Sequence, residues 1–500
     1  MTRRYLGRWP GVAGVAAAAL LLVLPEAALA QGEGLGSALD GVKTELDMTW
    51  IMIATALVIF MQAGFLLLEV GFSRSKNVGA GVAKILVNLG IVSIAWYMFG
   101  QGVNGPGNSI IGTDGFFFHV GQDVAGTVMG NADIGFALFG LAFCAVSLAI
   151  VWGTTLERIR FGAYVVFGFV FGALIYPLIA HAVWSGDGLL DNIGGKEVLD
   201  FAGSSVVHLT GATAGFAALL LLGARAGKYG NDGKPRAIPG HSMPLVGLGV
   251  MILWVGWFGF NAGSTLSTDD VAFAEVAWNT QLAAAAGVIG ALLIVWIKTR
   301  ALDVGMAGNG AIAGLVGITA GSGYVEQWAA PIIGFIAGVI VVYSVILIEK
   351  YLDDPVGALS AHGVAGIWGT LAVGIFGTER LVGDTASPGV WYGIIGDAPL
   401  SATVGQLGVQ AVGVAATFVV VFGLSMATFY AIKKTMGLRV SSEEELAGLD
   451  ISSHGMYGYP EDFIPREEYP MPSGPSPHVA GTPVAAPAPT QMTAESSSSA

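Results

Sequence analysis

Long apolar stretches recur along this chain and are separated by short polar or glycine-rich segments. Each holds roughly 20 residues, the length that an α-helix needs to cross the hydrocarbon core of a bilayer. Eleven stretches fit, near residues 49–70, 80–100, 134–153, 161–183, 201–223, 243–264, 272–297, 305–322, 330–349, 357–377 and 404–431. The segment 102–133 is too polar and glycine-rich to span and is expected to be an external loop. The pattern predicts an all-α membrane protein with eleven transmembrane helices.

Composition agrees with this class. The 500 residues are 54% hydrophobic and 11% charged, whereas soluble domains carry roughly 25% charged residues. The 75 glycines favour close packing between helices. Cys144 is the only cysteine, which excludes an intrachain disulfide and a CxxC metal site. No P-loop, GxSxG or dinucleotide fingerprint stands in a suitable setting, so we expect no enzyme, no cofactor and no nucleic-acid partner.

The two ends of the chain differ from its body. Residues 1–30 combine a basic start, an apolar stretch and an A-x-A site at 28–30, which indicates a cleaved signal peptide. An uncleaved first helix is the alternative. The helical body is expected over 45–435, a cytoplasmic tail over 436–460, and a disordered Pro/Ser-rich extension over 461–500. The net charge of −13 gathers near this end, where residues 441–500 hold nine acidic residues and one arginine.

The distribution of Lys and Arg predicts the orientation. Cleavage of the signal would leave the N-terminus outside, and eleven spans would then bring the C-terminus inside. Sixteen Lys and Arg residues fall at the expected inner positions, against Lys43, Lys196 and Arg380 at outer ones. Because cytoplasmic loops are enriched in these residues, we expect a multi-pass protein of the cell inner (plasma) membrane with a cytoplasmic C-terminus.

One motif occurs twice. D-x-x-G-x-x-x-x-H runs from Asp200 to His208 in the fifth span and from Asp354 to His362 in the tenth. A repeat unit of five spans places its second copy upside down, as two inverted five-helix repeats followed by a final helix. Eight helical residues cover about 12 Å. The two histidines are therefore expected to approach the membrane midplane from opposite sides.

Two histidines at this depth suggest a functional site, because ionisable residues inside a membrane are costly. Two neutral imidazoles can share one N–H···N bond and still offer a donor and an acceptor to a small molecule. An apolar pore with these groups suits a neutral, hydrogen-bonding solute such as ammonia, whereas a bare cation would lose its hydration there. Ordinary hydrogen bonds between helices are one alternative. Metal binding is another, but no third His, Cys or carboxylate is expected at that depth.

Aromatic residues gather where an outer entrance would lie. The sequence WFGFNAGS supplies Trp257, Phe258, Phe260 and Ser264. The third span supplies Phe139 and Phe143, an i, i+4 pair on one helix face, and the fourth span ends at Trp184. Aromatic faces beside a hydroxyl can attract a cation. An interfacial aromatic belt is the alternative.

Three aspartates open helices. Asp200 suits a helix cap, and a role in taking the substrate's proton is its alternative. Asp353 and Asp354 stand beside Pro355 and are interpreted as a cap.

Five segments together resemble the ammonium transporter family (Amt/Mep/Rh), in its bacterial and plant Amt branch, over about residues 45–460. They are LERIRF at 156–161, DFAGSSVVH at 200–208, WFGFNAGS at 257–264, DDPVGALSAHG at 353–363 and GLDISSHG at 448–455. The resemblance implies the ammonium transporter fold, assembled as a homotrimer with one pore per subunit.

By position, the resemblance also assigns roles. It implies that His208 and His362 are the pore histidines, that Phe143 and Phe260 form a gate, and that Asp200 is the acidic residue near the recruitment site. Phe139, Trp184 and Ser264 would bind ammonium outside. Ammonium would be deprotonated there, ammonia would pass the pore, and the proton would follow by a separate or shared route. A PII signalling protein would block many such pores from inside, although the long acidic tail here could alter its docking.

The sequence leaves other functions open. The chain could conduct another small neutral molecule, such as carbon dioxide or water. It could also be an ammonium sensor that barely conducts, although no output domain follows the last span.

Overall fold

The structure, a computed structural model, describes residues 32–119 and 126–460. The predicted signal peptide and the Pro/Ser-rich extension lie outside the described residues. Within these ranges all the elements are helical, and β-type pairing is limited to isolated bridges. The long helices are α3 (Gly32–Phe72), α4 (Val78–Ala95), α6 (Val128–Thr154), α7 (Phe161–Val170), α8 (Tyr176–Trp184), α9 (Thr210–Leu222), α10 (Met243–Asn261), α11 (Ala272–Thr299), α12 (Val304–Thr319), α13 (Ala329–Ile348), α14 (Ala365–Phe376) and α17 (Leu400–Thr435).

The predicted spans all coincide with helices. Within the described ranges, ten helical segments are long and apolar enough to cross a membrane. The eleventh expected span, 305–322, coincides with α12, whose 16 residues make it a shorter apolar helix. The third span begins at Val128, inside the stretch expected to be an external loop, so the loop between α5 (Gln101–Asn104) and α6 is shorter than predicted.

Helix contacts repeat between the two halves of the bundle. In the first half α3 packs on α6, α4 on α7, and α6 on α9; in the second, α10 packs on α12, α11 on α13, and α12 on α14. The first helices of the two halves, α3 and α10, also form the most extensive contact between any two elements. Because each half crosses the membrane five times, the second half runs in the opposite direction to the first.

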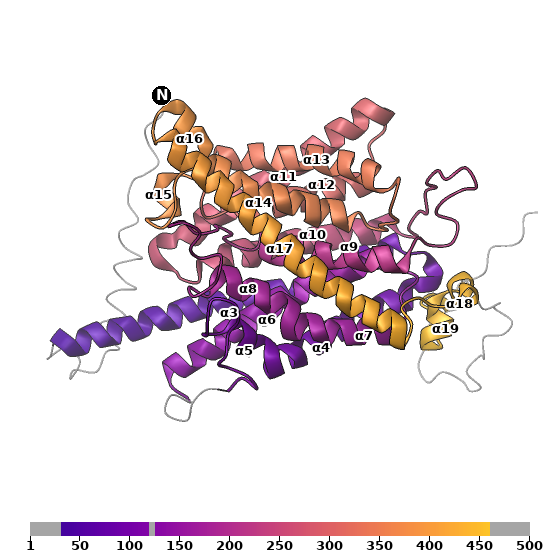
Figure 1. Cartoon of the computed structure of the whole chain (residues 1–500), viewed down its shortest axis with the longest axis horizontal. Coiled ribbons are helices and arrows are strands. Elements are labelled where there is room, and N and C mark those ends of the chain that lie inside the picture. Colours follow the sequence, from indigo (N-terminus) through magenta and orange to yellow (C-terminus); the bar gives the residue numbers. More distant parts are fainter. Residues whose placement is uncertain (1–31, 120–125, 461–500) are drawn as a thin grey trace, which may run out of the picture. The chain divides into compact units, whose positions relative to one another are not determined.

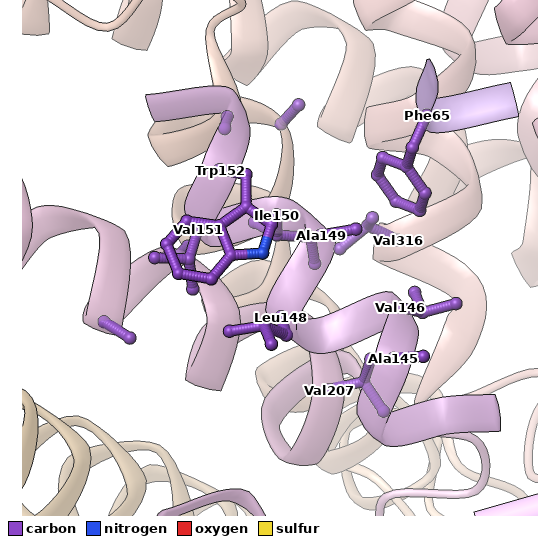
Figure 2. Packing of buried hydrophobic residues seen from close by; sticks show 14 of the residues in the cluster. Phe65, Ala145, Val146, Leu148, Ala149, Ile150, Val151, Trp152, Val207 and Val316 are labelled. Atoms are coloured by element: carbon purple, nitrogen blue, oxygen red, sulfur yellow. The ribbon is translucent and has the colours of Figure 1, made fainter. Parts of the chain in front are cut away.

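The core is centred on α6. From Ala142 to Gly153 every residue of this helix is buried, whichever side of the helix it is on. A helix that is apolar all round belongs in an interior position. Figure 2 shows apolar side chains of this helix packed near Phe65 of α3, Val316 of α12 and Val207; those labelled are Ala145, Val146, Leu148, Ala149, Ile150, Val151 and Trp152. This interior position places α6 against Ser204–Leu209, the segment that carries His208.

The last long helix and the tail cover the bundle. α17 crosses the preceding helices diagonally and packs on α9, α14 and α7 (Figure 1). Two short helices, α18 (Ser442–Ala447) and α19 (Leu449–His454), follow it. Asp450 of the GLDISSHG segment accepts a hydrogen bond from the backbone N–H of Ala80 at 2.9 Å. The tail is thereby attached to the start of α4.

Candidate functional site

The repeated motif forms a similar structure at both positions. Gly203 and Gly357, the glycines of the two D-x-x-G sequences, have φ of +108° and +75°. Glycine tolerates this left-handed backbone without steric strain. A π-helical segment follows each: Ser204–Leu209 before α9, and Leu359–Val364 before α14. Wide π turns are frequent at functional sites, and each of these carries one histidine.

The motif aspartates cap these segments to different extents. The Asp200 carboxylate accepts hydrogen bonds from the backbone N–H groups of four residues at 2.8–2.9 Å, namely Gly203, Ser204, Ser205 and Val206. The Asp354 carboxylate accepts one, from Leu359, at 2.7 Å. Both residues therefore act as helix caps, and the Asp200 cap is the more complete.

Asp353 does not cap the helix, contrary to the interpretation from sequence. Its carboxylate instead receives the Arg225 side chain in a bidentate pair, with both N···O distances 2.9 Å. Arg158, from the LERIRF segment, donates to the backbone carbonyl of Asp353 at 2.7 Å. Both arginine side chains are almost fully buried. These arginines hold the chain in position just before the π-helical segment of His362.

The two motif histidines meet in the interior. Their Nδ1 atoms lie 3.2 Å apart, and their rings are nearly parallel, at 20°. His208 is fully buried and His362 is 6% exposed. One ring donates the shared N–H and the other accepts it. The Nε2 atom of His208 is buried and has no hydrogen-bond partner, so it is free to bind a small polar molecule.

Aromatic rings surround the pair. Trp257 stacks on His208 with centroids 5.0 Å apart, and its Nε1–H donates to Thr319 at 2.9 Å. Sequence reasoning grouped Trp257 with the outer entrance, but the structure places it against the histidine. Phe260 lies 5.4 Å from His208 between ring centroids, and Phe65 lies 6.3 Å from His362.

Phe143 and Phe260 form a stacked pair next to His208. Their centroids are 4.0 Å apart and their planes differ by 15°. Both rings are buried, at 2% and 0% exposed. Phe139 contacts Phe143 at 4.5 Å between centroids. The predicted gate residues are thus in contact with each other and with the histidine environment.

The remaining residues predicted for the outer entrance lie next to this stack. Trp184 is 39% exposed and packs edge-on against Phe143 at 6.2 Å. Its Nε1–H donates to the backbone carbonyl of Asp200 at 2.7 Å. Ser264 is half-buried and donates to the carbonyl of Phe260 at 2.8 Å. Aromatic faces, a carbonyl and a hydroxyl therefore gather beside an exposed indole.

A narrow cavity lies on the other side of the pair. Its volume is about 20 Å³, which leaves room for roughly one water-sized molecule. His362, Glu69 and Asn309 are the polar residues that line it; Phe65, Leu68, Ala149, Ile150, Gly153, Leu253, Ile312, Val356, Ala358 and Ala361 complete the wall.

Sequence reasoning missed Glu69 when it expected no further carboxylate near the histidines. A lone carboxylate inside the apolar run GFLLLEVGF was the signal that could have identified it. Among the described residues, no group of three His, Cys, Asp or Glu side chains is arranged to hold a metal ion.

Comparison with known proteins agrees with this architecture. A sequence model of the Ammonium Transporter Family matches residues 49–459. The ammonium transporter Amt2 of Archaeoglobus fulgidus is 41% identical over 468 residues, covering 90% of this chain and 96% of that protein. The ammonium transporter of Bacillus subtilis is 36% identical over 426 residues, covering 83% and 99%.

Solved structures agree as well. A sensor Amt protein superposes with a TM-score of 0.75 and 34% identity, over 83% of this chain and all of that one. Mep2 of Candida albicans superposes with a TM-score of 0.71 and 30% identity, over 85% and 93%. With a family match across most of its length and relatives of this similarity, the chain is a multi-pass membrane protein that belongs to the ammonium transporter family.

Proposed function

We propose that this protein transports ammonium by passing ammonia through the apolar interior along His208 and His362. The contact between the two imidazoles, 3.2 Å between Nδ1 atoms inside an apolar bundle, is the observation that carries the proposal. Neutral imidazoles offer a donor and an acceptor without charge, and an apolar passage rejects a hydrated cation. The names of the similar proteins point to the same cargo.

The outer residues would recruit the cation. Ammonium would bind against Trp184 and Phe139 by cation–π attraction, with the Ser264 hydroxyl as a hydrogen-bond acceptor. It would lose its proton there, with Asp200 acting through the backbone it organises, and the proton would follow by a separate or shared route. The neutral ammonia would then pass between Phe143 and Phe260. The exposure of the Trp184 indole next to the buried ring pair supports this order.

The proposal extends to assembly and location. The protein would form a homotrimer with one pore per subunit in the inner membrane, after removal of residues 1–30. Its tail would lie in the cytoplasm, where a PII signalling protein could engage it. The excess of Lys and Arg at the inner positions supports this orientation.

Uptake of labelled methylammonium by cells that lack other ammonium transporters tests the proposal. We expect uptake that depends on expression of this chain and that ammonium inhibits by competition. A channel for carbon dioxide or water would instead give no methylammonium uptake that ammonium inhibits. Current measurements on the reconstituted protein would then show whether the proton crosses with the ammonia.

An ammonium sensor is the second candidate, because one of the similar solved structures is titled a sensor Amt protein. A sensor would bind ammonium and give little flux. If the cells bind ammonium through this protein but do not take up methylammonium, the protein is a sensor rather than a transporter.

A further inference from the structure

Glu69 of α3 is a buried carboxylate for which the proposed pathway has no use so far. It is 1% exposed, and neither of its carboxylate oxygens has a hydrogen-bond partner. Buried charges are normally paired and hydrogen-bonded, because removing them from water is costly. An unpaired carboxylate in the interior of a membrane protein is therefore a candidate for function.

The position of Glu69 connects it to the pore. Its side chain lines the same narrow cavity as His362. Phe65, one helical turn earlier on α3, contacts the His362 ring. Since four helical residues advance about 6 Å, Glu69 lies one turn beyond this contact, toward the end of α3 that is expected to face the cytoplasm.

Other charged and titratable groups around Glu69 leave its oxygens free. Lys84 of α4 is 2% exposed and attracts Glu69 electrostatically, but the two form no ion pair within 4.0 Å in the part of the chain that the structure describes. Tyr164 of α7 donates its hydroxyl to the backbone carbonyl of Lys84 rather than to the carboxylate. The positive charge of Arg158 repels Lys84, and the negative charge of Glu157 attracts it. Glu157 is itself paired with Arg74 at 2.5 Å. Asn309, also on the cavity wall, is uncharged.

We propose that Glu69 is the residue that returns a proton to the cargo on the inner side of the histidine pair. This inference rests on the proposed function. An ammonia molecule that leaves His362 meets the protonated carboxyl: the O–H bond breaks, the proton joins the nitrogen lone pair, and ammonium forms next to a carboxylate. The ammonium then leaves to the inner solution, and the carboxylate takes a proton from hydronium there. Because the proton given to ammonia is replaced by one from the inner solution, the net result of one cycle is the delivery of one neutral ammonia.

Ammonium pulses on proteoliposomes that contain a pH dye test the role of Glu69. At neutral inner pH we expect Glu69→Gln to lower the initial flux about tenfold. This is less than the ~100-fold loss typical of removing an acid–base group, because unprotonated ammonia can still leave slowly. The wild-type flux should fall as the inner pH rises, and the flux of Glu69→Gln should not depend on inner pH. Glu443→Gln is the control, because it makes the same change at an exposed position in the tail.

Glu69→Asp separates proton exchange from packing. Asp keeps a titratable group but is shorter, whereas Gln keeps the size and loses the proton. Proton exchange therefore predicts that Asp transports faster than Gln and keeps the dependence on inner pH. If Glu69→Gln does not fold, the test compares Glu69→Asp with the wild type, and we expect the dependence of its flux on inner pH to be shifted.

Two outcomes would overturn the role of Glu69. One is wild-type flux and a wild-type inner-pH profile in Glu69→Gln, and the other is a Gln variant that transports better than the Asp variant. Absence of ammonium flux in the wild-type protein would instead count against the proposed function.

Discussion

The Nδ1 atoms of His208 and His362 lie 3.2 Å apart, although 154 residues separate them along the chain. Each histidine comes from its own copy of the same motif, in a π-helical segment that follows a glycine with positive φ. The shared hydrogen bond uses one nitrogen of each ring, so each ring keeps one nitrogen for a passing molecule. The pair therefore has a direction, from a donor at one end to an acceptor at the other.

Replacing His208 and His362 together with Ala should abolish or alter selective ammonium flux while the protein still folds. The variant removes both polar groups and leaves an apolar passage that cannot bind ammonia by hydrogen bonds. Methylammonium uptake measures the flux, and size-exclusion chromatography checks the fold. His119→Ala is the control, because that histidine is exposed in the loop before α6. Selective uptake at the wild-type level in the double variant would remove the proposed role of the pair.

Phe143→Leu should weaken selection against other cations. Leu fills part of the space but cannot stack on Phe260, so an interaction of about 0.5–1.5 kcal/mol is lost and the barrier between the entrance and His208 loosens. Conductance to potassium, compared with that to ammonium, measures the effect in planar bilayers. Phe418→Leu is the matched control, because Phe418 stacks on Phe422 and is 37% exposed. An unchanged potassium conductance in Phe143→Leu would show that the ring pair does not gate.

Trp184→Leu should raise the ammonium concentration that gives half-maximal uptake. Loss of a cation–π contact of about 0.5–2 kcal/mol corresponds to an increase of roughly 2- to 30-fold, with little change in the maximal rate. Concentration dependence of uptake gives both quantities. Trp328→Leu serves for comparison, since this tryptophan is 42% exposed and its ring packs on Trp391 and Phe376. Equal shifts in the two variants would contradict recruitment by Trp184.

Asp353→Asn should destabilise the fold by about 3 kcal/mol, because it removes the nearer of two carboxylates paired with the buried Arg225 and leaves only Glu157, at 3.6 Å. Thermal unfolding in detergent measures this loss. Asp232→Asn is the control: its pair with Lys234 is exposed, and such pairs contribute at most about 1 kcal/mol.

The same carboxylate predicts how stability depends on pH. Burial alone would raise the pKa of Asp353, but the hydrogen bonds and charges of Arg225 and Arg158 outweigh it and lower the pKa from 3.8 to about 2. Ionised Asp353 therefore stabilises the folded state above about pH 4, and this contribution is lost as the pH falls through about 2. Between neutral pH and about pH 5, the stability difference between wild type and Asp353→Asn should stay constant. A difference that shrinks over that range would contradict the ion pair.

Much of the fold could be predicted because the signals are local. A run of apolar residues has to be a helix in lipid, since no water satisfies its backbone. All eleven expected spans coincide with helices for this reason, and only α12 is shorter than the other spanning helices. Helix ends were less certain: α6 begins six residues before the expected span, within a segment whose glycine and polar residues suggested a loop.

The candidate site could be predicted where the motif repeats. Identical spacing at Asp200–His208 and Asp354–His362 indicated two equivalent histidines, and a repeat unit of five spans implied opposite approaches. The different partners of Asp353 and Asp354 could not be distinguished, because the two residues are adjacent and chemically alike. Only the packing of the loop before α14 against Arg158 and Arg225 assigns one carboxylate to the arginines and the other to the helix cap.

By itself, the sequence determined the helices and indicated the two histidines, because hydropathy and motif spacing act within single segments; the orientation from Lys/Arg placement stays a prediction. The tertiary structure decided which side chains share a space: Trp257 against His208, Phe143 on Phe260, and Glu69 in the cavity under His362. These contacts join helices far apart along the chain. They depend on how each helix is rotated and shifted against its neighbours, and apolar periodicity around helices buried on all sides cannot specify that rotation.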